Sequence, residues 1–125
     1  AFSVFPEIRR KVSVFRLEPD KDGDVRVNPL DSLEEALKSS LGLSAVRLIE
    51  SGGDDDLTAA REQWNDSTNT LALAPGKVMT YDRNTASNET LRRNGVEVVE
   101  IEGSELVRGR GGPRCMSMPL LRAPV

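Results

Sequence analysis

The chain's only cysteine, Cys115, lies directly behind a segment rich in glycine and arginine, residues 108–114. A single cysteine cannot close an internal disulfide, so either packing or chemical reactivity must explain it. Arg110 and Arg114 favour the thiolate, which is the nucleophilic form, and the glycines leave the backbone free to approach a ligand. The chain contains no histidine, which is the most common partner of a nucleophilic cysteine. These residues favour a reactive thiol, and a small, packed structural cysteine is the alternative.

One cluster of aspartates invites comparison with a metal site. Asp20, Asp22 and Asp24 alternate as in a calcium-binding loop. Val25 and Asp31, however, stand where an EF-hand requires glycine and glutamate. We therefore predict a hairpin turn with its acids in solvent, and no metal site.

Segment 108–112 is similar to an RNA-binding RGG element. Such elements usually repeat within long disordered tracts, whereas this one occurs once in a chain with a net charge of -3 and a pI of about 5.1. The sequence also lacks a Walker A motif and a strand-linked GxGxxG motif. We predict no nucleic-acid partner, no nucleotide and no other cofactor.

The bulk properties are those of a globular protein. Its 125 residues suit one domain with a real core, and 38% of them are hydrophobic and 30% charged. No apolar run approaches the roughly 18 residues that a membrane span needs, so we expect no membrane partner. A single cysteine suits a reducing cytoplasm. The chain begins at Ala1 within an apolar stretch, which predicts a fragment or processed piece of a longer protein.

The elements that must position Cys115 alternate between strands and helices. Ser32 and Glu35 form a predicted capping box, and Gly42 supplies a left-handed stop, so a helix should run between them. Strand-forming residues lie on both sides of this helix, in ranges 1–5, 12–17, 25–27 and 45–49.

The second half of the chain repeats this order after a linking helix. The acidic run 54–56 complements the dipole of a helix over 57–64, in which Leu57, Ala60 and Trp64 share one apolar face. The remaining predictions are a hairpin of strands 70–74 and 77–81, a helix over 85–94 and a strand over 96–101. Two strand-strand-helix-strand units predict a modular α/β protein whose sheet edges are left unpaired.

Several segments closely resemble arginine deiminase, in register over essentially the whole chain and most densely from residue 52 onward. They are Gly52-Gly53-Asp54, Arg61 through Asp66, Ala74-Pro75-Gly76, Tyr81 through Asn84, and Ser104 through Ser117. Within the last of these, the run from Arg108 to Met118 is close to diagnostic among guanidine-modifying enzymes.

The resemblance implies the pentein fold, a five-bladed α/β propeller. This chain would supply about two ββαβ modules, at about 1–50 and 57–101, and the nucleophile loop 103–118. It would be the C-terminal part of a single catalytic domain. The family's histidine and its guanidinium-binding acids would lie upstream, which explains the missing histidine.

The resemblance also implies a reaction: hydrolysis of L-arginine to L-citrulline and ammonia through a covalent thiouronium on Cys115. Arg110 would pair with the substrate α-carboxylate, Gly109 would contribute backbone contacts, and Arg114 would gate or merely flank the site. For Gly109, a turn that needs a positive φ is an equal alternative. The segment 116–118 would form a strand that packs beneath the cysteine.

Two consequences follow for the isolated chain. It should be inactive, because its base and guanidinium clamp are absent, and its exposed sheet edges predict a homo-oligomer or other self-association. The alternative from another functional class is a non-catalytic, pentein-like binding or structural domain with an inert cysteine.

Overall fold

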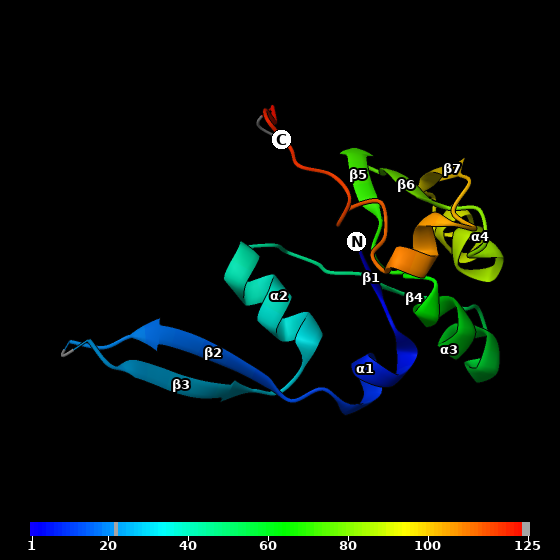
Figure 1. Ribbon diagram of the computed structural model, residues 1–125. Helices are drawn as coiled ribbons and strands as arrows, with labels where there is room; N and C mark the ends of the chain where they lie inside the picture. Colours follow the sequence, from blue (N-terminus) through cyan, green and yellow to red (C-terminus); the bar gives the residue numbers. More distant parts are fainter. Residues whose placement is uncertain (22, 124–125) are drawn as a thin grey trace. The chain divides into compact units, whose positions relative to one another are not determined.

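The computed structural model describes residues 1–21 and 23–123, traced in Figure 1. Asp22 of the predicted aspartate turn lies outside the described residues. The chain divides into two compact units, each described by itself below. Unit 1 comprises Ala1–Phe2 and Glu7–Leu48, and unit 2 comprises Ser3–Pro6 and the residues from Ile49 onward.

Unit 1 contains a hairpin and a helix. The hairpin is formed by β2 (Val14–Pro19) and β3 (Val25–Leu30), paired antiparallel with Leu17 opposite Val27. Both strands end later than predicted, β2 at Pro19 and β3 at Leu30, and β2 also begins two residues later, at Val14. Helix α2 (Leu33–Leu41) follows and contacts both strands.

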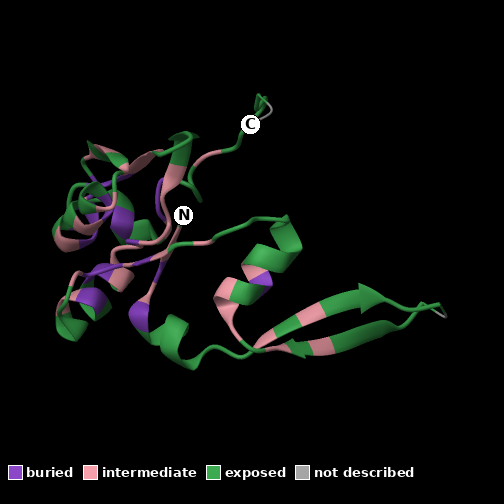
Figure 2. Cartoon of the chain, turned by 180° about the vertical axis from the view of Figure 1, so that it is seen from behind, coloured by how far each residue is buried: buried purple, intermediate pink, exposed green. Residues whose placement is uncertain are grey.

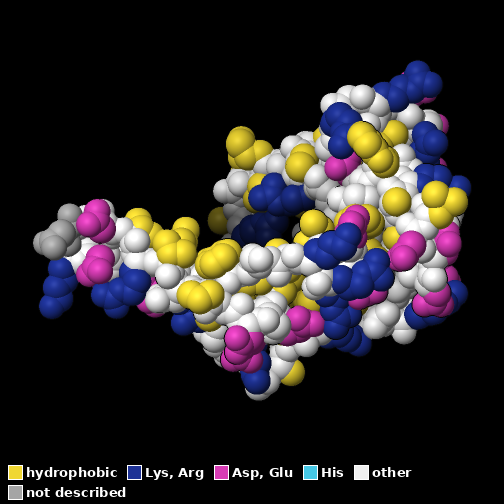
Figure 3. Space-filling model, turned by 90° about the horizontal axis from the view of Figure 1, so that it is seen from below, with side chains coloured by type: hydrophobic (Ala, Val, Ile, Leu, Met, Phe, Trp, Pro, Cys, Tyr) yellow, Lys and Arg dark blue, Asp and Glu magenta, His cyan; other side chains and the backbone are white. Residues whose placement is uncertain are grey.

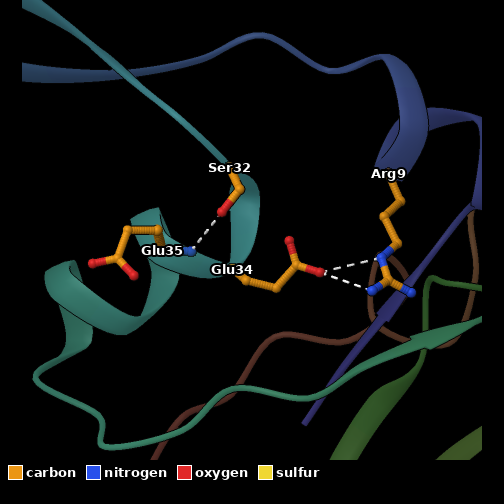
Figure 4. A network of polar contacts seen from close by, with 4 residues as sticks. All are labelled: Arg9, Ser32, Glu34 and Glu35. Atoms are coloured by element: carbon orange, nitrogen blue, oxygen red, sulfur yellow. Dashed lines mark hydrogen bonds and ion pairs between the residues drawn. The ribbon is translucent and has the colours of Figure 1, made fainter.

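The ends of α2 follow the sequence prediction in large part. The Ser32 hydroxyl accepts a hydrogen bond from the Glu35 amide at 3.1 Å, and Gly42 is left-handed with φ 63°. Figure 4 shows the Glu35 carboxylate pointing away from Ser32, so only the serine half of the predicted capping box is present. The neighbouring Glu34 instead forms an exposed ion pair with Arg9, with 2.9 Å between Nη2 and Oε1 (Figure 4).

A short helix and a pair of short strands complete the first half. Helix α1 (Pro6–Lys11), which the sequence analysis did not predict, begins at a buried proline, a residue suited to the first turn of a helix. Strand β1 (Phe2–Val4) pairs with β4 (Leu48–Glu50). The strand predicted over 45–49 is therefore shorter and later than expected.

Unit 2 contains a three-stranded sheet of order β5-β6-β7. Strands β5 (Leu71–Ala74) and β6 (Lys77–Tyr81) form the predicted antiparallel hairpin, and β7 (Glu97–Ile101) lies parallel to β6. Helix α4 (Thr85–Arg93) makes the crossover that a parallel pair requires, and it packs on β7. The predicted strand-strand-helix-strand order and the hairpin pairing are confirmed here, whereas the parallel pairing of β7 with β6 was not predicted.

Helix α3 (Asp56–Trp64) differs from the prediction in the face that it buries. Leu57 is 79% exposed and Trp64 is 69% exposed, whereas Ala59 and Glu62 are each 1% exposed. The apolar pattern was misleading because a buried carboxylate occupies the inner face. Glu62 accepts hydrogen bonds from the first turn of α4, so its polarity is satisfied inside the protein.

The largest fully buried side chains belong to unit 2 and are mainly polar, with Tyr81 and Glu62 the largest. In unit 1 most residues of the hairpin are exposed, as Figure 2 shows. Within the described part of the chain, no helix has the length and apolar character needed to cross a membrane.

Candidate active site

The segment that carries Cys115 leaves β7 and is held down by Tyr81, the last residue of β6. A 3-10 helix (Leu106–Gly109) follows Gly103, whose added Cβ would come within 2.4 Å of the Tyr81 ring. The Tyr81 hydroxyl, from a side chain with 0% exposure, donates to the Gly111 carbonyl at 2.9 Å. This bond ties the loop to the sheet just before the cysteine.

The loop between α3 and β5 holds the same segment from a second side. The Asp66 carboxylate accepts from the Gly111 amide at 3.1 Å, and Asp66 is itself left-handed with φ 57°. Gly112 lies against Asn69, because an added Cβ would come within 2.4 Å of the Asn69 carbonyl oxygen. Only glycine allows this close approach.

Cys115 is exposed and lies in a turn over residues 113–116. Asn69 contacts it twice: Nδ2 donates to Sγ at 2.6 Å, and Oδ1 accepts from the Cys115 amide at 3.3 Å. Exposure contradicts the alternative in which packing alone explains the cysteine. The strand predicted over 116–118 is also wrong: this segment leaves the turn without regular structure.

Arg110 begins the loop with a left-handed φ of 66°, and its guanidinium stacks on the Trp64 ring at 4.6 Å from the centroid. Such a cation–π contact at an exposed site contributes about 0.5–1 kcal/mol. The two side chains, with Gln63 and Asp66, line an open hollow of about 240 Å³. One positively charged residue and one carboxylate residue therefore line this hollow.

The other predicted site residues lie on the same loop without meeting the sulfur. Arg114 is exposed, and its Nη1 donates to the Ser117 carbonyl at 3.3 Å. Gly109 ends the 3-10 helix without a positive φ and with open space around it, so the interpretation as a left-handed turn is wrong. Among the described residues, no hydrogen bond joins the guanidinium of Arg110 or Arg114 to Cys115 Sγ.

The surroundings of the loop shift the pKa of Tyr81. Burial raises the pKa of Tyr81 above its ordinary value of 10.0, and the negative charges of Asp66 and Cys115 raise it further. The phenol therefore stays protonated and remains a hydrogen-bond donor to the loop. Across residues 1–21 and 23–123, no group of three or more His, Cys, Asp or Glu side chains could hold a metal ion.

Sequence reasoning missed the residues that hold the loop. Asp66 and Tyr81 lie in segments that resemble the family, but neither residue's type nor its spacing predicted a role in holding the loop. Asn69 lies outside those segments, and 46 positions separate it from Cys115. Only knowledge of the tertiary contact between the α3–β5 loop and the cysteine loop could have identified Asn69.

Comparison with known proteins gives this geometry its context. A protein-family model described as arginine deiminase matches residues 1–122. The chain belongs to the arginine deiminase family. Among its relatives, the arginine deiminase of Bacillus cereus (strain B4264) is 51% identical over 128 residues, covering 99% of this chain and 31% of the relative.

Other bacterial arginine deiminases agree. That of Lactococcus lactis subsp. cremoris (strain MG1363) is 52% identical over 97% of this chain, and that of Oenococcus oeni (strain ATCC BAA-331 / PSU-1) is 46% identical over 99%. These matches cover 30% and 31% of the relatives, respectively. The chain thus spans about a third of the length of the curated arginine deiminases that it matches.

Proposed function

We propose that this chain supplies the nucleophile loop of an arginine deiminase, which hydrolyses L-arginine to L-citrulline and ammonia. One observation carries the proposal: the only cysteine of a chain in this family is exposed, on a loop that Asp66, Asn69 and Tyr81 hold in place. A packed, inert cysteine would require neither the exposure nor the fixed loop.

The proposed chemistry has two stages. The Cys115 thiolate attacks the guanidinium carbon and forms a C–S bond, and the C–N bond breaks as the leaving nitrogen takes a proton and departs as ammonia. Water then attacks the thiouronium carbon, a C–O bond forms and the C–S bond breaks; of the two protons that the water gives up, one returns to the base and the other leaves to solvent. Arginine has become citrulline, and the thiolate is restored.

This sequence has no histidine, so the proton carrier must come from outside these 125 residues. The acids that hold the guanidinium are expected from the same source, which is the part of the relatives that this chain does not match. The reaction as written needs no redox partner, and we propose that it needs no cofactor.

The amino-acid end of the substrate is assigned to Arg110, with Gly109 as a backbone contact and Arg114 as a gating or flanking residue. A guanidinium fork binds a carboxylate bidentately, which selects an amino acid over a simple amine. Support comes from the open hollow beside Trp64, where the Arg110 side chain is held by stacking.

We also propose that the chain is part of a five-bladed pentein propeller, with modules at about 1–50 and 57–101. The β5-β6-α4-β7 arrangement of unit 2 supports one module. In the first half the order of elements is the same, but β4 pairs with β1 and not with β3. A cytoplasmic location and assembly into a homo-oligomer complete the proposal.

The test is citrulline production from L-arginine by a protein of the relatives' length that contains this chain. Cys115→Ser should lower turnover by more than about a thousandfold, because the serine hydroxyl is a far weaker nucleophile. A trapped arginine adduct should map to residue 115. Near-normal turnover of the variant would establish the alternative, a pentein-like domain with an inert cysteine. The 125-residue chain alone should give no measurable citrulline.

A further inference from the structure

The Asn69 side-chain amide meets residue 115 at two points, and we propose that Asn69 is a positioning residue that presents a hydrogen-bond donor to the Cys115 thiolate. The proposal rests on the proposed function, in which Cys115 is the nucleophile. It assigns a role to a residue of the α3–β5 loop, 46 positions from the cysteine along the chain.

The orientation of the amide follows from the backbone of Cys115. An amide N–H can only donate, so the atom of Asn69 that faces it at 3.3 Å must be the oxygen Oδ1. The other end of the planar amide, Nδ2, is then directed at Sγ, 2.6 Å away. A donor aimed at sulfur stabilises the anion, which accepts hydrogen bonds better than a neutral thiol.

Asn69 can fix the sulfur only if it is itself fixed. The backbone N–H of Asn69 donates to the backbone carbonyl of Asp66 at 2.9 Å, and the backbone carbonyl of Asn69 lies against Gly112 in the cysteine loop. Asp66 also accepts from the Gly111 amide at 3.1 Å. The α3–β5 loop therefore contacts the cysteine loop at three points, namely Gly111, Gly112 and Cys115.

The chemical consequence is that the thiolate is prepared before the substrate arrives. Nucleophilic attack needs the anion, and it needs the sulfur in one orientation toward the guanidinium carbon. Asn69 supplies both through one hydrogen bond without taking or giving a proton. It acts through Cys115 and needs no contact with the substrate.

The experiment measures thiolate reactivity directly and uses the 125-residue chain, whose single cysteine makes the reading unambiguous. The rate of Cys115 alkylation by iodoacetamide is followed by intact mass, at about pH 7 and at about pH 10. Asn69→Asp keeps the acceptor for the Cys115 amide and replaces the donor by an anion. Asn69→Ala removes both contacts but keeps the Cβ that lies against Gly112.

Asn28→Asp is the matched control, because it makes the same amide-to-carboxylate change on β3, where Asn28 donates to Glu18. In Asn69→Asp we expect alkylation at the lower pH to slow about tenfold, the size expected for losing a hydrogen bond to a charged group. At the higher pH the rate should be equal or faster, because a thiolate that has lost its hydrogen-bond donor is more nucleophilic. Asn69→Ala should change in the same direction and Asn28→Asp should match the wild type.

An unchanged ratio of the two rates in both Asn69 variants would overturn the proposal. So would an equal change at both pH values, since this would reflect access to the sulfur and not its charge. Thermal melting identifies a variant that has lost the fold, in which case the other variant decides. Because the assay involves no arginine, its result is separate from the Cys115→Ser citrulline test, and either hypothesis can fail alone.

Discussion

The two halves of the chain share the order strand, strand, helix, strand, but the two compact units have different interiors. In unit 2, β7 joins β6 in parallel, and Tyr81 and Glu62 are almost fully buried with hydrogen-bond partners. In unit 1, one apolar face of the β2–β3 hairpin is exposed. The strand after α2, β4, pairs with β1, and most of both strands belongs to unit 2. The order of strands and helices therefore does not fix their pairing, and buried polar partners distinguish the unit that carries the cysteine.

The exposed side of the hairpin can be defined from its register. It consists of residues that alternate along each strand and face one another across the pair: Phe15, Leu17 and Pro19 on β2, and Val25, Val27 and Pro29 on β3. We call this the hairpin face. All of these residues are exposed, with Leu17 at 65%, and Figure 3 shows hydrophobic side chains gathered along the hairpin.

The largest expected effect tests the buried polar interior of unit 2. The Glu62 carboxylate accepts from the amides of Ala86 and Ser87 at 2.9 and 2.8 Å, in place of a side-chain cap that Asn84 does not supply. In Glu62→Gln an NH₂ group replaces one of the two accepting oxygens, so one backbone N–H of α4 faces another donor and loses its hydrogen bond. The free energy of unfolding, measured by urea denaturation, should therefore fall by about 2–4 kcal/mol.

The matched change in unit 1 is Glu34→Gln, which removes the exposed ion pair with Arg9. The free energy of unfolding should fall by no more than about 1 kcal/mol. Equal losses in the two variants would contradict the contrast between a polar interior and a solvated surface.

A smaller effect concerns the pH dependence of stability through Tyr81. Its pKa is raised in the folded state, so above about pH 10 the folded chain keeps a proton that the unfolded chain loses. The contribution to stability is complete below pH 10 and is lost as the pH rises through the folded pKa. Tyr81→Phe should remove this dependence and lower the free energy of unfolding near neutral pH by about 1 kcal/mol, because the bond to Gly111 is lost.

Direct titration checks the premise, since Tyr81 is the only tyrosine in the chain. Its ultraviolet absorbance should change with a midpoint above 10.0, and Cys115→Ser should bring that midpoint closer to 10.0. A midpoint at or below 10.0 in the folded chain would disprove the buried, negatively surrounded phenol.

The smallest effect on stability tests the hairpin face. Leu17→Thr keeps a strand-forming residue and should change the free energy of unfolding by no more than about 0.5 kcal/mol. Light scattering at increasing concentration should nevertheless show weaker self-association than in the wild type, because exposed apolar surface is removed. Arg26→Thr, on the other face of β3, is the control and should leave association unchanged; a monomeric wild type would refute the premise.

Most helices and strands could be predicted from the sequence because caps and turns depend on residues close together in the chain. Ser32 and Gly42 delimit α2 as expected, and Pro75-Gly76 joins the predicted hairpin. These signals depend on neighbours within a few residues. The partner of β4 and the inner face of α3 depend on distant residues, so neither could be predicted from spacing.

The candidate site shows the same division. Cys115 and the loop around it could be recognised from consecutive residues, and the structure shows the thiol exposed. Asn69 and Asp66 could not, because their roles arise only where the α3–β5 loop meets residues 111–115. A contact between distant segments leaves no periodic trace in the sequence.

The backbone conformation of Arg110 suits glycine, whereas its guanidinium side chain stacks on Trp64. A φ of 66° with a ψ of 153° suits glycine and costs a residue with a Cβ about 1–3 kcal/mol, yet an arginine stands at this position. Thermostability alone would favour removing the side chain. A glycine at position 110 would relieve this backbone strain, but it would lose the stacking on Trp64 and the carboxylate-binding role that we propose for Arg110.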